Sequence, residues 1–377
     1  MNKKLIAAAL ASAFIAPAVL ADVQVYGVMN ADVESVKATG AVNPSTDIKS
    51  ATRVSSNTSR IGFKGNEDLG NGLKAIWQVE QFVFLDGTNG TGNQAVQSSM
   101  NRFATRNSFV GLDINNAGQL LLGQYDSAYK TLVKPVNPLS DGIADINVTT
   151  FSRGDARYKN SVHYYSPNWD GFKIGASYGF DESRPDVAAY GRANSNVWAL
   201  AASYDIAGFN VAAGYTRQND LIKADPVTGL PVSPTALSAD SVSYWKAVAK
   251  YTIADTQIGA GYERKNQNGV TAAGDFHQNT WTIGAIQQFG AFGIGLAYVK
   301  IGEQSNLDNS GANQWTVAGT YDLSKRTQAY AFYTRINNDD KGTFNFANNP
   351  IANSSGVGGV GAGSNPTGFG LGLKHTF

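Results

Sequence analysis

Polar and apolar residues alternate along most of the chain, and this period of two constrains the fold more than any other feature of the sequence. In residues 59–64, for example, Arg60 and Lys64 alternate with Ile61 and Phe63. Successive side chains of a β-strand point to opposite faces, so each such segment has one polar and one apolar face. The segments run for about nine to twelve residues, the length that a tilted strand needs to cross a bilayer. The pattern therefore predicts an all-β fold of membrane-spanning strands.

Short and long connections alternate between these segments. The short turns carry the Gly, Asn, Asp or Pro that a tight reversal needs, and lie at residues 66–72, 115–118, 167–171, 205–208, 254–255, 290–291 and 324–326. The long polar connections lie at residues 34–54, 85–104, 126–156, 181–196, 219–241, 266–279, 302–313 and 337–366. Seven turns and eight loops separate sixteen antiparallel strands. Short turns on one side and long loops on the other are typical of an outer-membrane β-barrel, and sixteen strands leave an aqueous channel.

Aromatic residues gather near the predicted short turns, where amphipathic rings favour the headgroup level of a membrane. They are Tyr164, Trp169, Phe172, Tyr204, Phe209, Tyr251, Phe289, Phe292, Tyr321 and Tyr330. The last predicted strand, residues 367–377, turns Phe369, Leu371 and Leu373 outward. We expect it to pair with residues 23–33, because an open strand edge in lipid leaves backbone groups without hydrogen bonds.

An export signal is predicted at the start of the chain. Lys3 and Lys4 precede an uncharged, alanine-rich run over residues 5–20, and residues 19–21 (VLA) match the pattern that signal peptidase cuts after. The alternative is a membrane anchor, but the run is shorter than the ~20 residues of a spanning helix. We therefore expect a signal peptide at residues 1–21 and one barrel domain at residues 22–377. Cysteine is absent, so disulfides and thiolate sites are excluded.

Several stretches, in the order in which they occur, resemble the general (trimeric) porins of Gram-negative bacteria, in particular the beta-proteobacterial and neisserial type. They are residues 25–27 (VYG), 59–75 (SRIGFKGNEDLGNGLKA), 109–112 (FVGL), 122–126 (LGQYD), 160–167 (NSVHYYSP) and 374–377 (KHTF). The resemblance covers the whole chain. It implies a homotrimer of sixteen-stranded barrels in the outer membrane, whose third outer loop folds into the lumen and narrows it.

The resemblance also implies a pore constriction between that loop, here residues 126–156, and a basic cluster on the wall. The positions that match the basic cluster are Arg60, Arg106 and Arg157. The loop carries the acids Asp126, Asp141 and Asp145 and the bases Lys130, Lys134 and Arg153. Lys74, Glu80 and Lys159 extend the two sides. Gln124 stands where the family usually has Arg, which weakens the expected anion preference.

Alternation supports part of this set independently. With Ile61 and Phe63 facing lipid, Arg60 and Lys64 face the lumen. With Val162 and Tyr164 facing lipid, Arg157, Lys159, Ser161 and His163 face the lumen. A charge on the lipid face at mid-bilayer costs about 2–4 kcal/mol, which favours the inward placement. Guanidinium groups facing acids across a wet gap make a transverse field that admits polar solutes and sets ion preference.

Other functions remain open at this stage. A substrate-selective channel, an outer-membrane hydrolase, and an adhesin or phage receptor acting through the long loops are the alternatives to a diffusion pore. The run GVGGVG at residues 356–361 matches a dinucleotide-binding pattern, but it has neither the strand before it nor the helix after it. The three histidines share no metal-ligand spacing. His163 and Ser161 could belong to a hydrolytic triad, but nothing in the sequence supplies the acid that would complete it. We therefore predict no cofactor, no metal and no catalytic residue.

Overall fold

The computed structural model describes residues 22–87, 103–180, 186–187, 191–192, 195–219, 241–268, 275–352 and 359–377. The predicted signal peptide lies outside these residues, as do parts of several predicted long loops. Within them, no helix is both long enough and apolar enough to cross a membrane.

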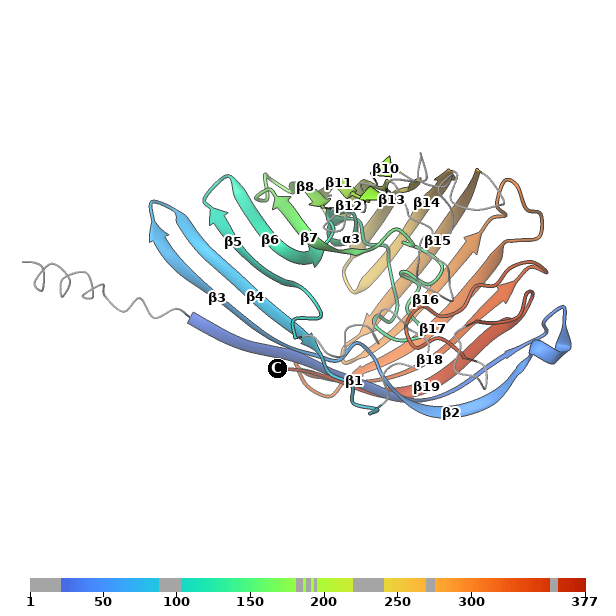
Figure 1. Cartoon of the computed structure of the whole chain (residues 1–377). Helices are drawn as coiled ribbons and strands as arrows, with labels where there is room; N and C mark the ends of the chain where they lie inside the picture. Colours follow the sequence, from blue (N-terminus) through green and yellow to red (C-terminus); the bar gives the residue numbers. More distant parts are fainter. Residues whose placement is uncertain are drawn as a thin grey trace, which may run out of the picture.

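Antiparallel strands of one closed sheet make up the wall of the molecule (Figure 1). They are β1 (Asp22–Thr39), β2 (Ile48–Ser56), β3 (Arg60–Gly70), β4 (Leu73–Phe82), β5 (Ser108–Ile114), β6 (Gly118–Asp126), β7 (Arg157–Tyr165), β8 (Phe172–Gly179), β11 (Val197–Ile206), β12 (Phe209–Gln218), β13 (Ser241–Ile253), β14 (Thr256–Asn268), β15 (Phe276–Phe289), β16 (Phe292–Ile301), β17 (Ala312–Asp322), β18 (Thr327–Asn338) and β19 (Asn365–Thr376). β9 (Asp186–Val187) and β10 (Gly191–Arg192) pair only with each other.

The strand segments β2 and β3 form a single wall strand. Both pair antiparallel with β1, β2 with its second half and β3 with its first half. The break between them falls at residues 57–59, where Thr58 has a positive φ of 51°. The wall is therefore the predicted antiparallel barrel of sixteen strands.

Closure occurs between the first and last strands, as predicted, but in a different register. β1 pairs with β19 from Val28 opposite Thr376 to Thr39 opposite Asn365, so the contact lies further along β1 than residues 23–33. The backbone of Phe377 adds two hydrogen bonds to Gly27. Each of the described wall strands, with β2 and β3 taken as one, thus pairs on both sides, so backbone groups that lipid cannot satisfy find partners in the sheet.

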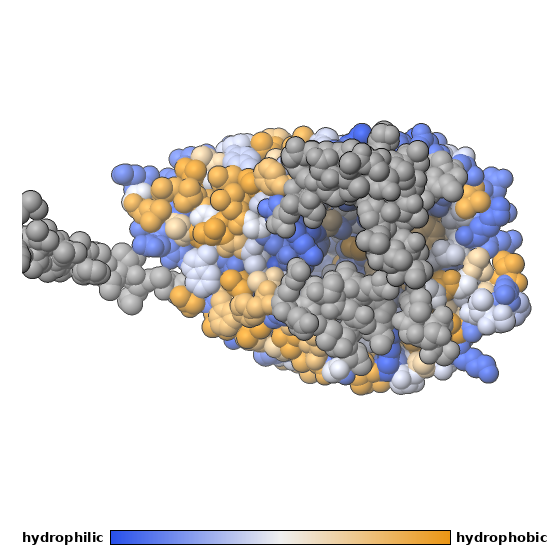
Figure 2. Space-filling view, viewed as in Figure 1, coloured by the Kyte–Doolittle hydropathy of each residue, from blue (hydrophilic) through white to orange (hydrophobic). Residues whose placement is uncertain are grey.

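The two faces of the wall differ in polarity, as the alternation predicts. Large apolar side chains are exposed on the outside, with Leu371 69% and Ile283 60% accessible. Figure 2 shows such apolar side chains gathered on the outer wall between more hydrophilic ends. Ser161 and His163 are buried inside, as predicted. Tyr330, however, is not a girdle residue: it points inward and donates a 2.7 Å hydrogen bond to Asn30 Oδ1.

The predicted short turns match the structure closely, but the first long loop does not. β1 continues to Thr39 and β2 begins at Ile48, so the connection spans residues 40–47 rather than 34–54. It contains the short 3-10 helix η1 (Pro44–Thr46). Of the extra strand residues, Glu34 and Arg53 form an ion pair in which Glu34 accepts a hydrogen bond from Arg53 Nε at 2.7 Å. A strand segment that carries charged residues on its inner face looks like a polar loop in the sequence, which is why residues 34–39 and 48–54 were assigned to the loop.

The third long loop, residues 127–156, lies inside the barrel. It begins with the helix α3 (Ala128–Leu132), and Val133, Ile143, Ala144 and Phe151 along it are fully buried. A row of inward-facing glycines makes room for it. A Cβ added at any of them would lie within about 3 Å of a loop atom: Gly175, Gly214, Gly259, Gly261, Gly284, Gly295 and Gly368. The loop therefore packs directly against wall backbone from β8 around to β19.

Candidate functional site

Polar contacts at both ends of the loop attach it to the wall. At its start, Tyr165 donates to the carbonyl of Asp126 at 2.7 Å, and Ser177 Oγ accepts from the amide of Ala128 at 2.9 Å. Further along, Thr316 Oγ1 donates to the carbonyl of Ala144 at 3.2 Å. These contacts come from widely separated strands, so the loop is held across the lumen rather than at one hinge.

A buried ion pair also attaches the loop to the wall. Lys246 on β13 is fully buried, and its Nζ lies 2.5 Å from Asp155 Oδ1 and 2.9 Å from Ser152 Oγ. The same ammonium lies 4.2 Å from the ring centroid of Tyr129, whose hydroxyl donates to Glu263 at 2.7 Å. Ion pairs shielded from water are strong only when fully hydrogen-bonded, and here every partner is supplied by the loop or the adjoining strands.

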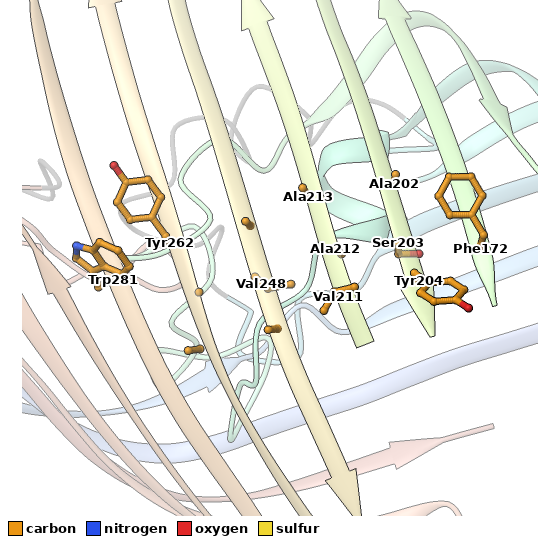
Figure 3. A pocket seen from close by; sticks show the side chains of 14 residues that line it. Phe172, Ala202, Ser203, Tyr204, Val211, Ala212, Ala213, Val248, Tyr262 and Trp281 are labelled. Atoms are coloured by element: carbon orange, nitrogen blue, oxygen red, sulfur yellow. The ribbon is translucent and has the colours of Figure 1, made fainter. Parts of the chain in front are cut away.

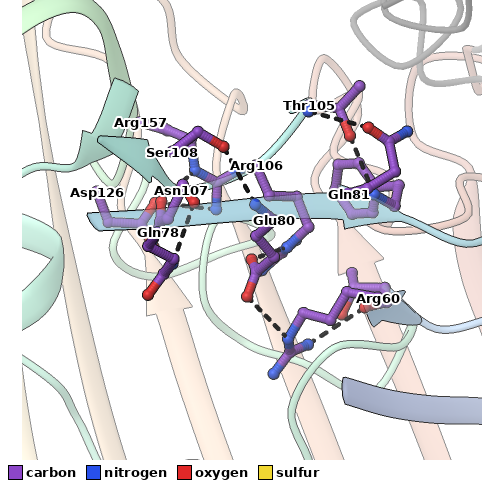
Figure 4. A network of polar contacts seen from close by, with 12 residues as sticks. Arg60, Gln78, Glu80, Gln81, Thr105, Arg106, Asn107, Ser108, Asp126 and Arg157 are labelled. Atoms are coloured by element: carbon purple, nitrogen blue, oxygen red, sulfur yellow. Dashed lines mark hydrogen bonds and ion pairs between the residues drawn. The ribbon is translucent and has the colours of Figure 1, made fainter. Parts of the chain in front are cut away.

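On the opposite wall, three strands bring charged side chains together (Figure 4). Glu80 on β4 accepts from Arg106 Nε at 2.5 Å and lies 3.8 Å from Arg60 Nε. Arg60 also reaches Asp141 on the loop at 3.7 Å. Lys374 on β19 lies 3.8 Å from the same Asp141 oxygen. The loop thus presents one acid to two cations of the wall.

A second group of charged side chains surrounds Asn107, which follows Arg106 of the first group in the chain. Asp126 lies 2.9 Å from Lys130 Nζ and 3.1 Å from Arg157 Nη2. Asn107 bridges them, because it accepts from Arg157 Nε at 2.5 Å and donates to Asp126 at 3.2 Å. Gln124, which stands where the family usually has Arg, donates to the carbonyls of residues 105 and 106 at 3.0 and 2.9 Å. It therefore orients the backbone that carries Arg106.

Four other predicted residues lie elsewhere. Lys74 stands beside the turn at residues 71–72, at the short-turn end of the barrel. Asp145 is bound within the loop by three N–H donors, and burial raises its pKa to about 7 against their effect. Arg153 is bound to β15, where its guanidinium donates to Gln278 at 2.7 Å and to Thr280 at 3.2 Å.

The fourth, Lys159, is exposed because β7 is irregular. The register against β6 shifts between Tyr158 and Ser161, where two residues oppose one, and Asn160 has a φ of 47°. A bulge of this kind interrupts the alternation. Tyr158 takes the inward position instead, and its hydroxyl shares a 2.5 Å hydrogen bond with Thr216 Oγ1. The single inward face that we predicted for Arg157, Lys159, Ser161 and His163 is therefore wrong at Lys159.

Two members of the site were missed by the sequence reasoning. Lys374 shares the parity of the inward Gly370 and Gly372, so the alternation of the last strand already contained this signal. Tyr26 shares the parity of Gln24, and its hydroxyl donates to Glu80 at 3.1 Å.

The site is accessible to solvent and carries an excess of positive charge. Its side chains are 7–32% exposed. Five cations (Arg60, Arg106, Lys130, Arg157 and Lys374) face three carboxylates (Glu80, Asp126 and Asp141), an excess of two positive charges. Within the described ranges, no group of three or more His, Cys, Asp and Glu side chains could hold a metal ion. The arrangement can attract anions and orient dipoles.

Comparisons with known proteins identify relatives of the chain. The sequence profile of the Gram-negative porin family matches residues 7–341. The major outer membrane protein P.IB of Neisseria meningitidis is 35% identical over 225 residues, 59% of this chain and 61% of that protein. The chain thus spans about three-fifths of this relative's length. Outer membrane porin protein 32 of Delftia acidovorans is 28% identical over the full length of both chains.

Solved structures show the same fold. The anion-selective porin from Comamonas acidovorans superposes with a TM-score of 0.72 at 24% identity, covering 95% of this chain and all of that one. OmpT of Vibrio cholerae, folded in vitro, superposes with a TM-score of 0.67 at 16% identity, covering 96% of this chain and all of that one.

Proposed function

The chain belongs to the Gram-negative porin family and is an outer-membrane β-barrel, and from this premise we propose that it forms a water-filled channel for passive diffusion of small hydrophilic solutes and ions. The observation that supports this most is the wet cluster of five cations and three carboxylates between the wall and the inserted loop. A solvent-accessible cluster of this kind acts on solutes that pass it.

The charges act through their arrangement across the lumen. Arg60 and Lys374 on the wall approach Asp141 on the loop at 3.7–3.8 Å, so the field between them runs across the diffusion path. A polar solute gains energy by aligning its dipole there, whereas an apolar solute only displaces ordered water. The excess of positive charge favours anions over cations, since rings of charged side chains set ion preference. We propose a weak anion preference.

The residues that set this preference are those that meet at the two ion-pair groups. We assign the constriction to Arg60, Glu80, Arg106, Asp126, Lys130, Asp141 and Arg157, with Lys374 added. Lys74, Asp145 and Arg153 contribute little to it, because they lie at the barrel end, within the loop and on another part of the wall. Lys159 contributes little because it is exposed at the bulge of β7.

The remaining features follow from the family. We propose that residues 1–21 are removed on export, that residues 22–377 form one barrel domain, and that three copies assemble in the membrane. The OmpT structure described as a trimer form supports this assembly by fold alone. No chemical step is proposed at the site, since its role is passage rather than reaction.

Planar-bilayer recording tests the channel proposal directly. Protein lacking residues 1–21 is refolded in detergent and inserted, and the step conductance and the reversal potential under a KCl gradient are measured. We expect large ohmic steps, closure in three equal parts at high voltage, and a reversal potential on the anion-selective side. The double variant Arg60→Gln/Arg106→Gln should move that potential towards cation selectivity. Lys325→Gln, a charge removed at an exposed short turn, is the control and should leave it unchanged.

A folded barrel without conductance contradicts the channel itself. A conducting barrel whose reversal potential does not change in Arg60→Gln/Arg106→Gln contradicts only the assignment of the constriction. The same holds if Lys325→Gln changes the reversal potential by as much as the arginine variant does.

A further inference from the structure

A short pattern recurs on the outer face of four wall strands near the long-loop end. In each, a tyrosine is followed two residues later by a cation: Tyr215 and Arg217 on β12, Tyr262 and Arg264 on β14, Tyr298 and Lys300 on β16, and Tyr333 and Arg335 on β18. Residues two apart on a strand point the same way. Leu296, with the parity of Tyr298, is 45% exposed on the outer wall, so these cations also face outward.

The strands between them supply tryptophans at the same level. The register sets each one directly opposite a cation: Trp198 and Arg217, Trp245 and Arg264, Trp281 and Lys300, and Trp315 and Arg335. The rings also meet the tyrosines, with centroids 4.4 Å apart for Tyr262–Trp281 and for Tyr298–Trp315. We call these four tryptophans, four tyrosines and four cations the outer belt. Trp and Tyr favour the membrane–water interface, so the cations stand at the depth of lipid phosphates.

Within the part of the chain that the structure describes, the three arginines of the outer belt are oriented by neutral partners and form no ion pair. An asparagine two residues further on accepts from Nε of each, at 2.6 Å for Arg217, 3.0 Å for Arg264 and 2.6 Å for Arg335. Among the described residues, no carboxylate oxygen lies within 4.0 Å of these guanidinium groups. Lys300 differs, because it lies 3.9 Å from Asp339. A neutral amide holds the guanidinium plane in place and leaves its charge for a ligand.

An apolar groove lies on the outer wall beside these cations (Figure 3). It has a volume of about 600 Å³ and is floored mainly by small residues of β11 to β14, including Ala202, Ala213, Ala247, Ala249 and Ala260. Tyr262 and Trp281 of the outer belt border one end, and Phe172 and Tyr204 border the other. The groove therefore runs from Tyr262 and Trp281 of the outer belt along the apolar wall towards Phe172 and Tyr204 near the short turns, a course that an acyl chain could follow below its headgroup.

We propose that the outer belt binds anionic lipid of the outer leaflet, with the arginine guanidiniums contacting the headgroup phosphate and one acyl chain lying in the groove below Arg264. A guanidinium matches phosphate geometry with two parallel hydrogen bonds. One basic side chain near a membrane surface strengthens binding of anionic lipid by about five-fold. Charge complementarity selects this occupant, because a second protein would have to bring a matching row of acids into the bilayer. The proposal goes beyond conduction and does not depend on it.

Quenching of tryptophan fluorescence by brominated lipid measures the contact directly. Four of the six tryptophans belong to the outer belt, and Trp77→Phe/Trp169→Phe removes the other two. In this background we compare bilayers of phosphatidylcholine that contain brominated phosphatidylglycerol with bilayers that contain brominated phosphatidylcholine. We expect the anionic lipid to bind several-fold more strongly. Arg264→Gln/Arg335→Gln should reduce that preference by about five-fold, and Arg264→Lys/Arg335→Lys should restore part of it.

The matched control removes two cations at an exposed short turn, Lys325→Gln/Arg326→Gln, and should keep the preference. Equal quenching by the two lipids in the protein with an unmodified belt overturns the proposal. An equal loss of the preference for anionic lipid in the belt and control variants also overturns it, because the lipid would then be attracted by the net charge of the protein and not by the outer belt. Loss of the preference in millimolar inorganic phosphate would identify a site for small anions and also overturn it. Heat-modifiable migration on a gel shows that each variant is folded, and unchanged conductance separates this result from failure of the channel proposal.

Discussion

The inserted loop should depend on a single buried lysine. Lys246 Nζ lies 2.5 Å from Asp155 and has no exposed surface, while the Asp155 side chain is 7% exposed. Lys246→Met keeps the volume of the side-chain stem but removes the ammonium, so Asp155 is left buried without a cation. Breaking a buried pair by removing one partner costs about 3–5 kcal/mol.

That penalty falls on the state in which the loop is packed against the wall. Since every 1.4 kcal/mol is a factor of ten, a cost of about 3–5 kcal/mol should raise the fraction of molecules with the loop detached by roughly 10²- to 4 × 10³-fold. Burial raises the pKa of Asp155 to about 6 even with Lys246 present, and loss of the ammonium raises that pKa further. The carboxyl is then neutral at acid pH and charged at alkaline pH. The variant should therefore be least stable at high pH and recover as the pH falls.

Thiol labelling reports the detached state, because the chain has no cysteine of its own. Val133→Cys places a thiol on a fully buried position of the loop, next to Gly214, whose register partner is Lys246. We expect a membrane-impermeant reagent to label it much faster in Lys246→Met. The control Lys246→Met/Asp155→Leu removes both charges and should label at close to the original rate, since replacing both members of a pair by apolar groups is nearly neutral. Equal labelling rates with and without Lys246 would refute the reasoning.

Three further outcomes follow from single contacts. Glu80→Gln removes the carboxylate shared by two arginines, so the reversal potential under a KCl gradient should shift further towards anion selectivity. Gly118→Ala should abolish refolding to the heat-modifiable form, because Gly118 has a φ of 99° and a Cβ there would lie 2.2 Å from a backbone carbonyl of the next strand. Burial raises the pKa of Asp145 to about 7, above its unfolded value, so urea stability should fall as the pH rises from about 4 to 7, and Asp145→Asn should remove that part of the slope.

Each of these outcomes has a result that would contradict it. A Glu80→Gln channel with unchanged selectivity would remove that carboxylate from the diffusion path. Normal refolding of Gly118→Ala would mean that the turn tolerates a shift of its neighbour. An identical pH slope in the Asp145 variant would mean that other buried acids account for it.

Much of the fold is a local property and was predicted from the sequence. Alternation identified the strands and the lipid-facing side of each, as Leu371 and Ile283 show. Turn residues located the reversals to within a few positions, since Gly and Asn adopt the backbone angles that tight turns require. Local regularity failed at the bulge beside Lys159, and the prediction failed with it. Tyr330 was misassigned for another reason: it follows the regular alternation of β18 and points inward, whereas the girdle prediction used only its distance from a turn.

The sequence by itself determined a sixteen-stranded barrel with polar inside and apolar outside, because a period of two acts over neighbouring residues and needs no knowledge of distant ones. Only the tertiary structure decided which charges meet. Lys374 reaches Asp141 across more than 200 residues of chain, and the inserted loop follows a row of glycines spread over six strands. Both depend on barrel closure and on the space left inside it, which are properties of the assembled wall rather than of any one strand.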